Sequence, residues 1–213
     1  MERRGSGRPP RIGILAVQGA VREHAEAIRA VGAEPVEVRL PRDLAEVDAL
    51  ILPGGESTTM RKMIDEYGLR EPIRAFAAGG APMFGTCAGM ILLADRLADG
   101  GDPVFPLLDI EVRRNAYGRQ LDSFEADLQI PVLGEAPLHG VFIRAPVVSE
   151  VGPAAEVLAV DPDGRPIAVR QGRVLATAFH PELTPDRRLH ELLLRMLDDA
   201  PPPREPTEAA AES

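Results

Sequence analysis

The chain has 213 residues, 45% of them hydrophobic, which is enough for one sizeable core and predicts a single domain. The formal net charge is -9, and no basic cluster follows the N-terminal Met-Glu-Arg-Arg, so binding to nucleic acid is not expected. The single cysteine, Cys87, cannot form an intrachain disulfide and suits a reducing, cytoplasmic setting. Since neither an export signal nor an apolar run of about 20 residues is present, we expect a soluble protein without a membrane span.

Both ends of the chain are rich in residues that disfavour a packed core. Residues 1–10, and residues 200–213 with their proline, glutamate and alanine, are predicted to be disordered. Residues 11–199 are predicted to form the folded domain. Within it, short apolar runs alternate with helical patterns, which predicts an α/β fold: a three-layer, doubly wound, mostly parallel sheet with antiparallel additions.

The predicted elements follow one another in βα order through the first half of the chain. Strands are expected at residues 12–17, 36–40, 49–52 and 82–84, and in the second half at 109–113, 138–144, 157–160, 167–171 and 173–179. Helices are expected from the end of the first strand to about residue 31 and at 58–67, 72–78, 90–97 and 186–197. The second half is expected to be partly antiparallel, because tight turns such as Asp163-Gly164 join its strands.

Cys87 lies in Gly-Thr-Cys-Ala-Gly, between a short apolar strand and an apolar helix. This is the pattern of a nucleophile elbow, in which a strained turn exposes the nucleophile and small neighbours avoid a clash. The helix N-terminus favours the thiolate, which is the reactive form. The alternative is a buried structural cysteine.

A cysteine nucleophile needs a base, and His180 is the best placed of the four histidines. It stands at the end of a predicted strand, and in an extended segment Glu182 points to the same side and can orient the ring. The residues predict a Cys87, His180, Glu182 triad; the alternative is that the last two merely end a strand at the surface. His24, on the polar side of the first helix, His139, in a turn, and His190, in the last helix, are expected to be solvated or structural.

The segment Pro-Gly-Gly-Glu-Ser, residues 53–57, follows a strand and contains two adjacent glycines. Their backbone freedom can aim an N–H group inward, so the loop is a candidate oxyanion hole. The N–H groups of Gly55 and Ala88 would bind the oxyanion that forms when Cys87 attacks an amide carbonyl. A plain turn is the alternative.

Together, the motifs at residues 53–57, 85–89 and 180–182 resemble those of the triad-type, or class I, glutamine amidotransferases. The stretches at residues 18–24, 54–60, 119–125 and 140–146 narrow the resemblance to glutaminase subunits of pyridoxal 5'-phosphate synthase, over residues 12–197. The resemblance implies Cys87 as the nucleophile, His180 as the general base and acid, and Glu182 as the residue that orients it. It also implies that bound glutamine contacts six residues: Gly54, Gly55, Glu56, Arg114, Ile143 and Arg144.

Residues 115–117 read Asn-Ala-Tyr where many relatives have Asn-Ser-Phe, which leaves the assignment intact. An arginine suits the carboxylate of glutamine, but the spacing does not say whether Arg114 or Arg144 binds it.

The resemblance further implies a partner. The chain would hydrolyse L-glutamine to glutamate and ammonia, and the ammonia would pass to a synthase subunit docked in part on residues 18–24. No metal or bound cofactor is expected, since pyridoxal phosphate is the product of the partner. Three alternatives stay open: a glutaminase for another synthase, a cysteine peptidase or hydrolase on the same sheet, and a non-catalytic binding module.

Overall fold

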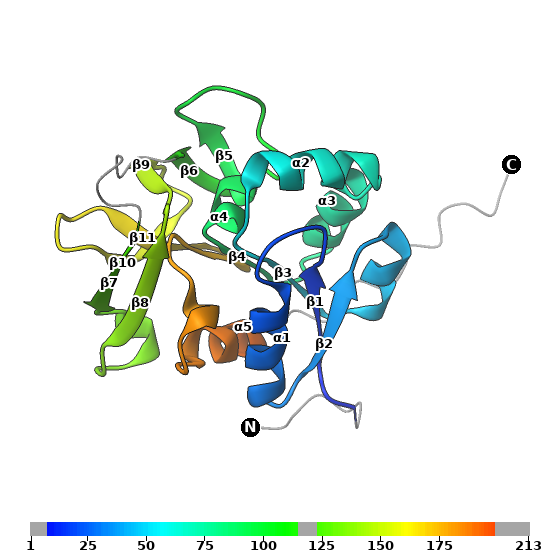
Figure 1. The fold of residues 1–213 in the computed structure, drawn as a ribbon, viewed down its shortest axis with the longest axis horizontal. Coiled ribbons are helices and arrows are strands. Elements are labelled where there is room, and N and C mark those ends of the chain that lie inside the picture. Colours follow the sequence, from blue (N-terminus) through cyan, green and yellow to red (C-terminus); the bar gives the residue numbers. More distant parts are fainter. Residues whose placement is uncertain (1–7, 115–122, 199–213) are drawn as a thin grey trace, which may run out of the picture.

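The computed structural model describes residues 8–114 and 123–198. Of the ends predicted to be disordered, residues 1–10 and 200–213, the structure describes only residues 8–10; the sequence stretch at 115–122 also lies outside the described residues. Within them, the structure confirms the α/β class, with a mainly parallel central sheet between two helical layers (Figure 1).

The central sheet has seven strands in the order β10-β11-β12-β4-β3-β1-β2. Five of them are parallel: β1 (Arg11–Leu15), β2 (Glu34–Val38), β3 (Ala49–Leu52), β4 (Met83–Thr86) and β12 (Val174–Thr177). The antiparallel strands β10 (Glu156–Val160) and β11 (Pro166–Gln171) extend one side. Strands β1, β3 and β4 are buried almost throughout, as apolar runs covered on both faces should be.

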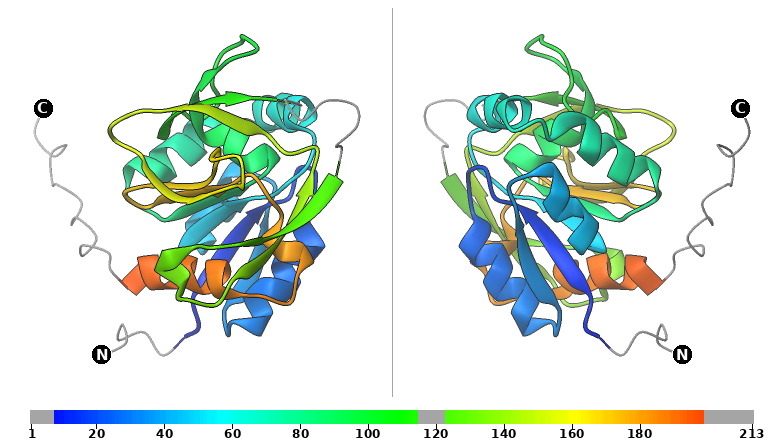
Figure 2. Two further views of the ribbon diagram at one scale, coloured as in Figure 1. Left: turned by 90° about the vertical axis from the view of Figure 1, so that its left-hand side faces the viewer. Right: turned by 90° about the vertical axis from the view of Figure 1, so that its right-hand side faces the viewer.

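Helices cover both faces of this sheet. Figure 1 shows α2 (Ser57–Glu66), α3 (Arg70–Ala78) and α4 (Ala88–Leu93) on one face and α1 (Val21–Ala30) and α5 (Arg188–Asp198) on the other. The side views in Figure 2 show the same separation. Short 3-10 turns at Pro41–Glu46, Pro131–Leu133 and Pro181–Leu183 complete the connections. Among the described residues, no helix has the length and apolar character that crossing a membrane requires.

Two small sheets flank the central one. One consists of β5 (Ala94–Leu97), β6 (Leu108–Arg113) and β9 (Val147–Val151), and the other is the antiparallel pair of β7 (Ser123–Leu128) and β8 (Leu138–Ile143). The sequence did not predict β5, β7 or β9. Alternate residues of β7 face solvent, so its pattern carries few apolar residues.

The prediction of one helix over residues 90–97 is wrong. Helix α4 ends at Leu93, and Ala94 takes an extended conformation that begins β5. The loop that follows folds back, so that the N–H groups of Phe105 and Leu107 donate to the carbonyls of Leu92 and Leu93. Because these bonds satisfy the end of the helix and β5 gains β6 as a parallel partner, tertiary contacts outweigh the local helical pattern.

The sheet determines where a ligand can bind. In the parallel order β2-β1-β3-β4-β12, the connections reverse direction between β1 and β3. Open α/β sheets bind ligands beyond the carboxyl ends of their strands at such a switch point. The segments that follow β1, β3, β4 and β12 carry Gln18, Gly54, Cys87 and His180, so the fold gathers the predicted site at this end.

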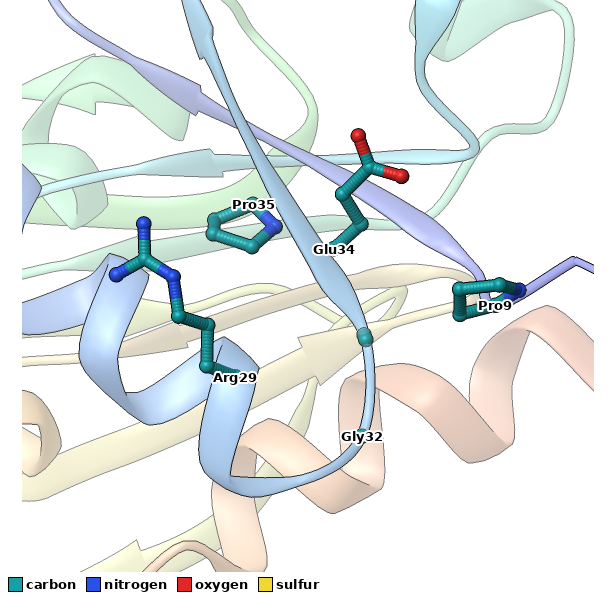
Figure 3. Close-up of a pocket in the computed structure, with 6 residues that line it drawn as sticks. Pro9, Arg29, Gly32, Glu34 and Pro35 are labelled. Atoms are coloured by element: carbon teal, nitrogen blue, oxygen red, sulfur yellow. The ribbon is translucent and has the colours of Figure 1, made fainter.

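A shallow pocket of about 360 Å³ lies elsewhere, at the start of β2 (Figure 3). Its lining residues are Pro9, Arg29, Gly32, Ala33, Glu34 and Pro35. Residues 32–35 lead into the amino end of β2, opposite the end at which the predicted site residues gather. The pocket therefore takes no part in the candidate site.

Candidate active site

Cys87 occupies the sharp turn between β4 and α4, with φ 50° and ψ -103°. This conformation is strained for a residue with a side chain, and strain of this kind is typical of functional sites. A Cβ at Gly89 would lie 2.0 Å from the Leu52 carbonyl oxygen, and one at Gly85 would lie 2.6 Å from the Gly89 backbone. The two glycines of the motif are thus required by close packing, as the elbow pattern predicts.

The segment after β12 brings His180 to this turn. The N–H of Cys87 donates to the Thr177 carbonyl at 2.8 Å, and the N–H of His180 donates to the Val141 carbonyl at 2.8 Å. His180 Nδ1 lies 2.8 Å from Glu182 Oε1, and Cys87 lies close enough to the ring to raise the pKa of His180. The predicted triad therefore comes together, with all three side chains buried.

One detail of that prediction is wrong. β12 ends at Thr177, and Pro181–Leu183 form a 3-10 turn, so His180 and Glu182 do not share an extended segment. The turn still allows the Glu182 carboxylate to reach the His180 ring, because the contact spans only two residues.

The charges of the triad are coupled. Burial lowers the pKa of His180, but hydrogen bonds to Cys87 and Glu182, and their charges, raise it to about 10 overall. Burial raises the pKa of Glu182, yet the neighbouring His24 and His180 bring it below its usual value. At neutral pH, His180 is therefore an imidazolium ion, and its charged ring lies between the side chain of Cys87 and the carboxylate of Glu182.

The double-glycine loop lies against the triad. A Cβ at Gly54 would lie 2.3 Å from His180 Cε1, so this glycine packs directly on the His180 ring. The Gly54 carbonyl accepts a hydrogen bond from the N–H of Ala20 at 3.0 Å, and the N–H of Glu56 donates to Gln18 Oε1 at 2.8 Å. The loop is thus held by the segment that enters α1.

Glu56 uses its carboxylate locally. The side chain accepts hydrogen bonds from the N–H groups of Thr58 and Thr59, capping α2, and from the Thr59 hydroxyl. These bonds lower its pKa to about 2 despite a small opposing effect of burial. The N–H of Glu56 donates to Gln18 and its carbonyl accepts from the N–H of Met60, so Glu56 holds the loop to the start of α2 through its backbone as well as its carboxylate.

The segment after β8 forms another wall of the site. The thiol of Cys87 donates weakly to the Ile143 carbonyl, with Sγ and oxygen 3.7 Å apart. Arg144, the next residue, has φ 43°, and within the described residues only Cys87 shares such a positive φ among non-glycines. Both strained residues therefore lie at one place, which supports its assignment as a functional site.

Arg114 directly follows β6 and lies next to this wall, because Arg113 pairs with Val147 of β9. Its backbone N–H donates to Asp99 Oδ2 at 2.8 Å, and its Nε lies 3.5 Å from the same oxygen. An exposed carboxylate thus orders this guanidinium group at the edge of the site. The residues that follow, 115–122, are outside the described part of the chain.

Two histidines lie elsewhere than expected. His24 is completely buried and not on a polar side of α1, and its Nδ1 lies 3.1 Å from Nε2 of His190, which is buried in α5, the last helix, as predicted. His24 stands three residues after Val21 and four before Ile28, so helical spacing already places it on the apolar face of α1. His139 lies in strand β8, not in a turn, exposed between acidic residues of β7.

Within residues 8–114 and 123–198, no three His, Cys, Asp or Glu side chains are grouped so as to hold a metal ion. The chemistry available at this site is that of a cysteine nucleophile, an imidazolium and backbone N–H groups. This set suits acyl transfer from an amide.

Comparison with known proteins identifies the family. The sequence model of the SNO glutamine amidotransferase family matches residues 14–199. A pyridoxal 5'-phosphate synthase subunit PdxT from Herpetosiphon aurantiacus is 57% identical over 86% of this chain and 98% of its own length. The PdxT subunit of Moorella thermoacetica is 54% identical over 88% of this chain and 99% of its own length. A solved structure, described as a glutamine amidotransferase, superimposes with a TM-score of 0.83 at 47% identity, over 88% of this chain and 98% of the other. The chain therefore belongs to the SNO glutamine amidotransferase family.

Proposed function

We propose that Cys87, His180 and Glu182 carry out the glutamine hydrolysis of this glutaminase subunit of pyridoxal 5'-phosphate synthase. The observation that carries the assignment is the buried arrangement in which Glu182 hydrogen-bonds the His180 ring and Cys87, at a strained elbow, lies close enough to raise the pKa of that ring. Agreement with curated subunits of that synthase over almost their whole lengths supports the choice of reaction.

The reaction follows from the charge state of the triad. The Cys87 thiolate attacks the side-chain carbonyl of glutamine and forms a tetrahedral oxyanion. The His180 imidazolium donates its proton to the departing ammonia, which leaves a γ-glutamyl thioester. His180, now neutral, takes a proton from a water molecule while the water oxygen attacks the thioester carbonyl, and glutamate is released. Glu182 holds the ring orientation and stabilises its charge throughout.

Backbone groups around the elbow would bind the oxyanion and the substrate. The N–H of Ala88 follows the nucleophile, and the N–H of Gly55 belongs to the loop that packs on the His180 ring. Glutamine would contact the loop residues Gly54, Gly55 and Glu56, the Ile143–Arg144 bend and Arg114. Metal ions and organic cofactors have no step in this mechanism.

The state of the loop offers a means of control by the partner. Because a trans peptide holds its C=O and N–H on opposite sides, the Gly54 carbonyl that bonds Ala20 sends the Gly55 N–H the other way. A flip of this peptide would break the bond to Ala20 and reverse the N–H. We infer that docking of the synthase near residues 18–24 completes the oxyanion hole through this segment.

The partner would be the synthase subunit, in a hetero-oligomeric complex that passes ammonia directly to the second active site. The chemical reason is that free ammonia is mostly protonated at neutral pH and then no longer nucleophilic. A cytoplasmic location fits the single reduced cysteine, which forms no disulfide.

A peptidase or a non-catalytic module has less support. The assembled triad weighs against a binding module, and the family match weighs against a peptidase or a glutaminase of another synthase.

The decisive test is glutamate release from glutamine by the purified chain, with and without the synthase subunit, using Cys87→Ala as the control. We expect activity that rises when the synthase is added and disappears in the variant. Activity that does not change when this synthase is added would point to a different partner. Activity that remains in Cys87→Ala would refute the assignment of Cys87 as the nucleophile.

A further inference from the structure

Behind the triad lies a second layer of buried polar side chains that the reaction scheme leaves unused. His24 of α1, Thr86 of β4 and His190 of α5 are all completely buried. His24 Nδ1 lies 3.1 Å from His190 Nε2, and His24 Nε2 lies 3.1 Å from Thr86 Oγ1. Burial lowers the pKa of both histidines, that of His190 to about 3, so both rings are neutral at physiological pH.

This layer touches the triad at Glu182. One carboxylate oxygen, Oε1, bonds the His180 ring, while Oε2 is buried and, within the described residues, has no hydrogen-bond partner. His24 Nε2 is 3.5 Å from Oε2. Catalytic hydrogen bonds are often long in the absence of substrate and shorten in the working complex.

The surrounding groups determine where His24 carries its proton. With the proton on Nδ1, the Nε2 lone pair would face the Glu182 carboxylate, and His190 would keep a buried Nδ1–H without an acceptor. With the proton on Nε2, His24 donates toward Thr86 and Glu182 and accepts at Nδ1 from the His190 N–H. The second arrangement avoids both penalties, so His24 presents a donor to the carboxylate.

We propose that His24 is a positioning residue of the glutaminase site, which holds the second carboxylate oxygen of Glu182 and, through it, the His180 ring. This role rests on the proposed assignment of the triad. His190 acts one step further away, since its N–H fixes the tautomer of His24. This layer of buried polar side chains thus links helices α1 and α5 to the nucleophile.

The test compares two substitutions of His24. Leucine removes the donor, whereas glutamine retains an N–H near the position of Nε2. For His24→Leu in the complex with the synthase subunit, we expect kcat to fall about 10- to 100-fold, because this factor corresponds to the free energy of a hydrogen bond to a charged group. KM for glutamine should stay unchanged, because a completely buried ring cannot touch the substrate. His24→Gln should recover most of the lost kcat.

A second readout does not require glutamine. The rate at which iodoacetamide alkylates Cys87 reports the orientation of His180, and it should slow about tenfold in His24→Leu, as a weakened imidazolium–thiolate pair predicts. Ile28→Ala is the matched control: Ile28 is buried on the same helix, and its truncation destabilises the fold without touching Glu182. We expect this control to keep both rates.

The proposal is overturned if His24→Leu matches the wild type in kcat and alkylation rate, or if His24→Gln has no higher kcat than His24→Leu. It is also overturned if Ile28→Ala shows the same losses. Failure of the proposed function has a different signature. In that case the wild type releases no glutamate, while alkylation of Cys87 still depends on His24.

Discussion

Gly54→Ala should damage catalysis by displacing His180, the proposed base. An added Cβ would lie 2.3 Å from His180 Cε1 and 2.8 Å from Nδ1, where ordinary contact begins at 3.4 Å. The ring must therefore retreat by about 1 Å or the loop must shift by as much, and a misplacement of about this size costs roughly 100-fold in rate. In activation free energy this amounts to about 2.7 kcal/mol.

The assay is the initial rate of glutamate release by the complex with the synthase subunit, at glutamine concentrations that separate kcat from KM. Gly79→Ala serves as the control. Its Cβ would meet the Phe76 carbonyl at 3.3 Å, and its φ of -68° suits alanine, so it introduces the same methyl group without reaching the site.

Thermal unfolding of both variants separates a displaced ring from a loss of folded protein. A Gly54→Ala enzyme that is folded and keeps kcat within twofold of the wild type would refute the reasoning, since the contact between Gly54 and His180 would then not exist in the working enzyme.

Three further results are expected. Cys87→Gly should be more stable than Cys87→Ala by about 1 kcal/mol in chemical denaturation, because glycine relieves strain at φ 50° that outweighs its usual entropic cost; a more stable alanine variant would contradict this. Glu56→Ala should lower stability by about 1 kcal/mol at pH 7 through loss of the helix cap. Because the pKa of Glu56 in the folded protein is depressed to about 2 from 4.5, the stabilisation by its carboxylate is complete above pH 4.5 and disappears as the pH falls toward 2. The unfolding free energies of the wild type and Glu56→Ala, measured by chemical denaturation, should therefore converge across that range. Arg114→Lys should raise KM for glutamine about tenfold with kcat nearly kept, because lysine cannot form the two-pronged bond to a carboxylate that Asp99 prepares. A larger KM effect of Arg144→Lys, measured in parallel, would reverse this assignment.

Local chemistry along the chain was sufficient to predict the nucleophile. The elbow depends on one strained residue, Cys87, between two glycines, and each requirement can be read within five consecutive residues. The pairing of His180 with Glu182 is also local, since the residues are two apart, and the sequence predicts it although the structure has a 3-10 turn in place of the expected extended segment.

Only the tertiary structure decided what stands behind and beside the triad. Strand β5 forms because β6 offers a partner, although residues 90–97 are apolar enough to favour a helix. The contact between His24 and His190 spans 166 residues and depends on α1 and α5 covering the same face of the sheet. Helical spacing does place His24 on an apolar face, but it cannot reveal which groups that face meets. Short-range backbone geometry is encoded where it occurs, whereas a buried polar network depends on the order in which the sheet brings its strands and helices together.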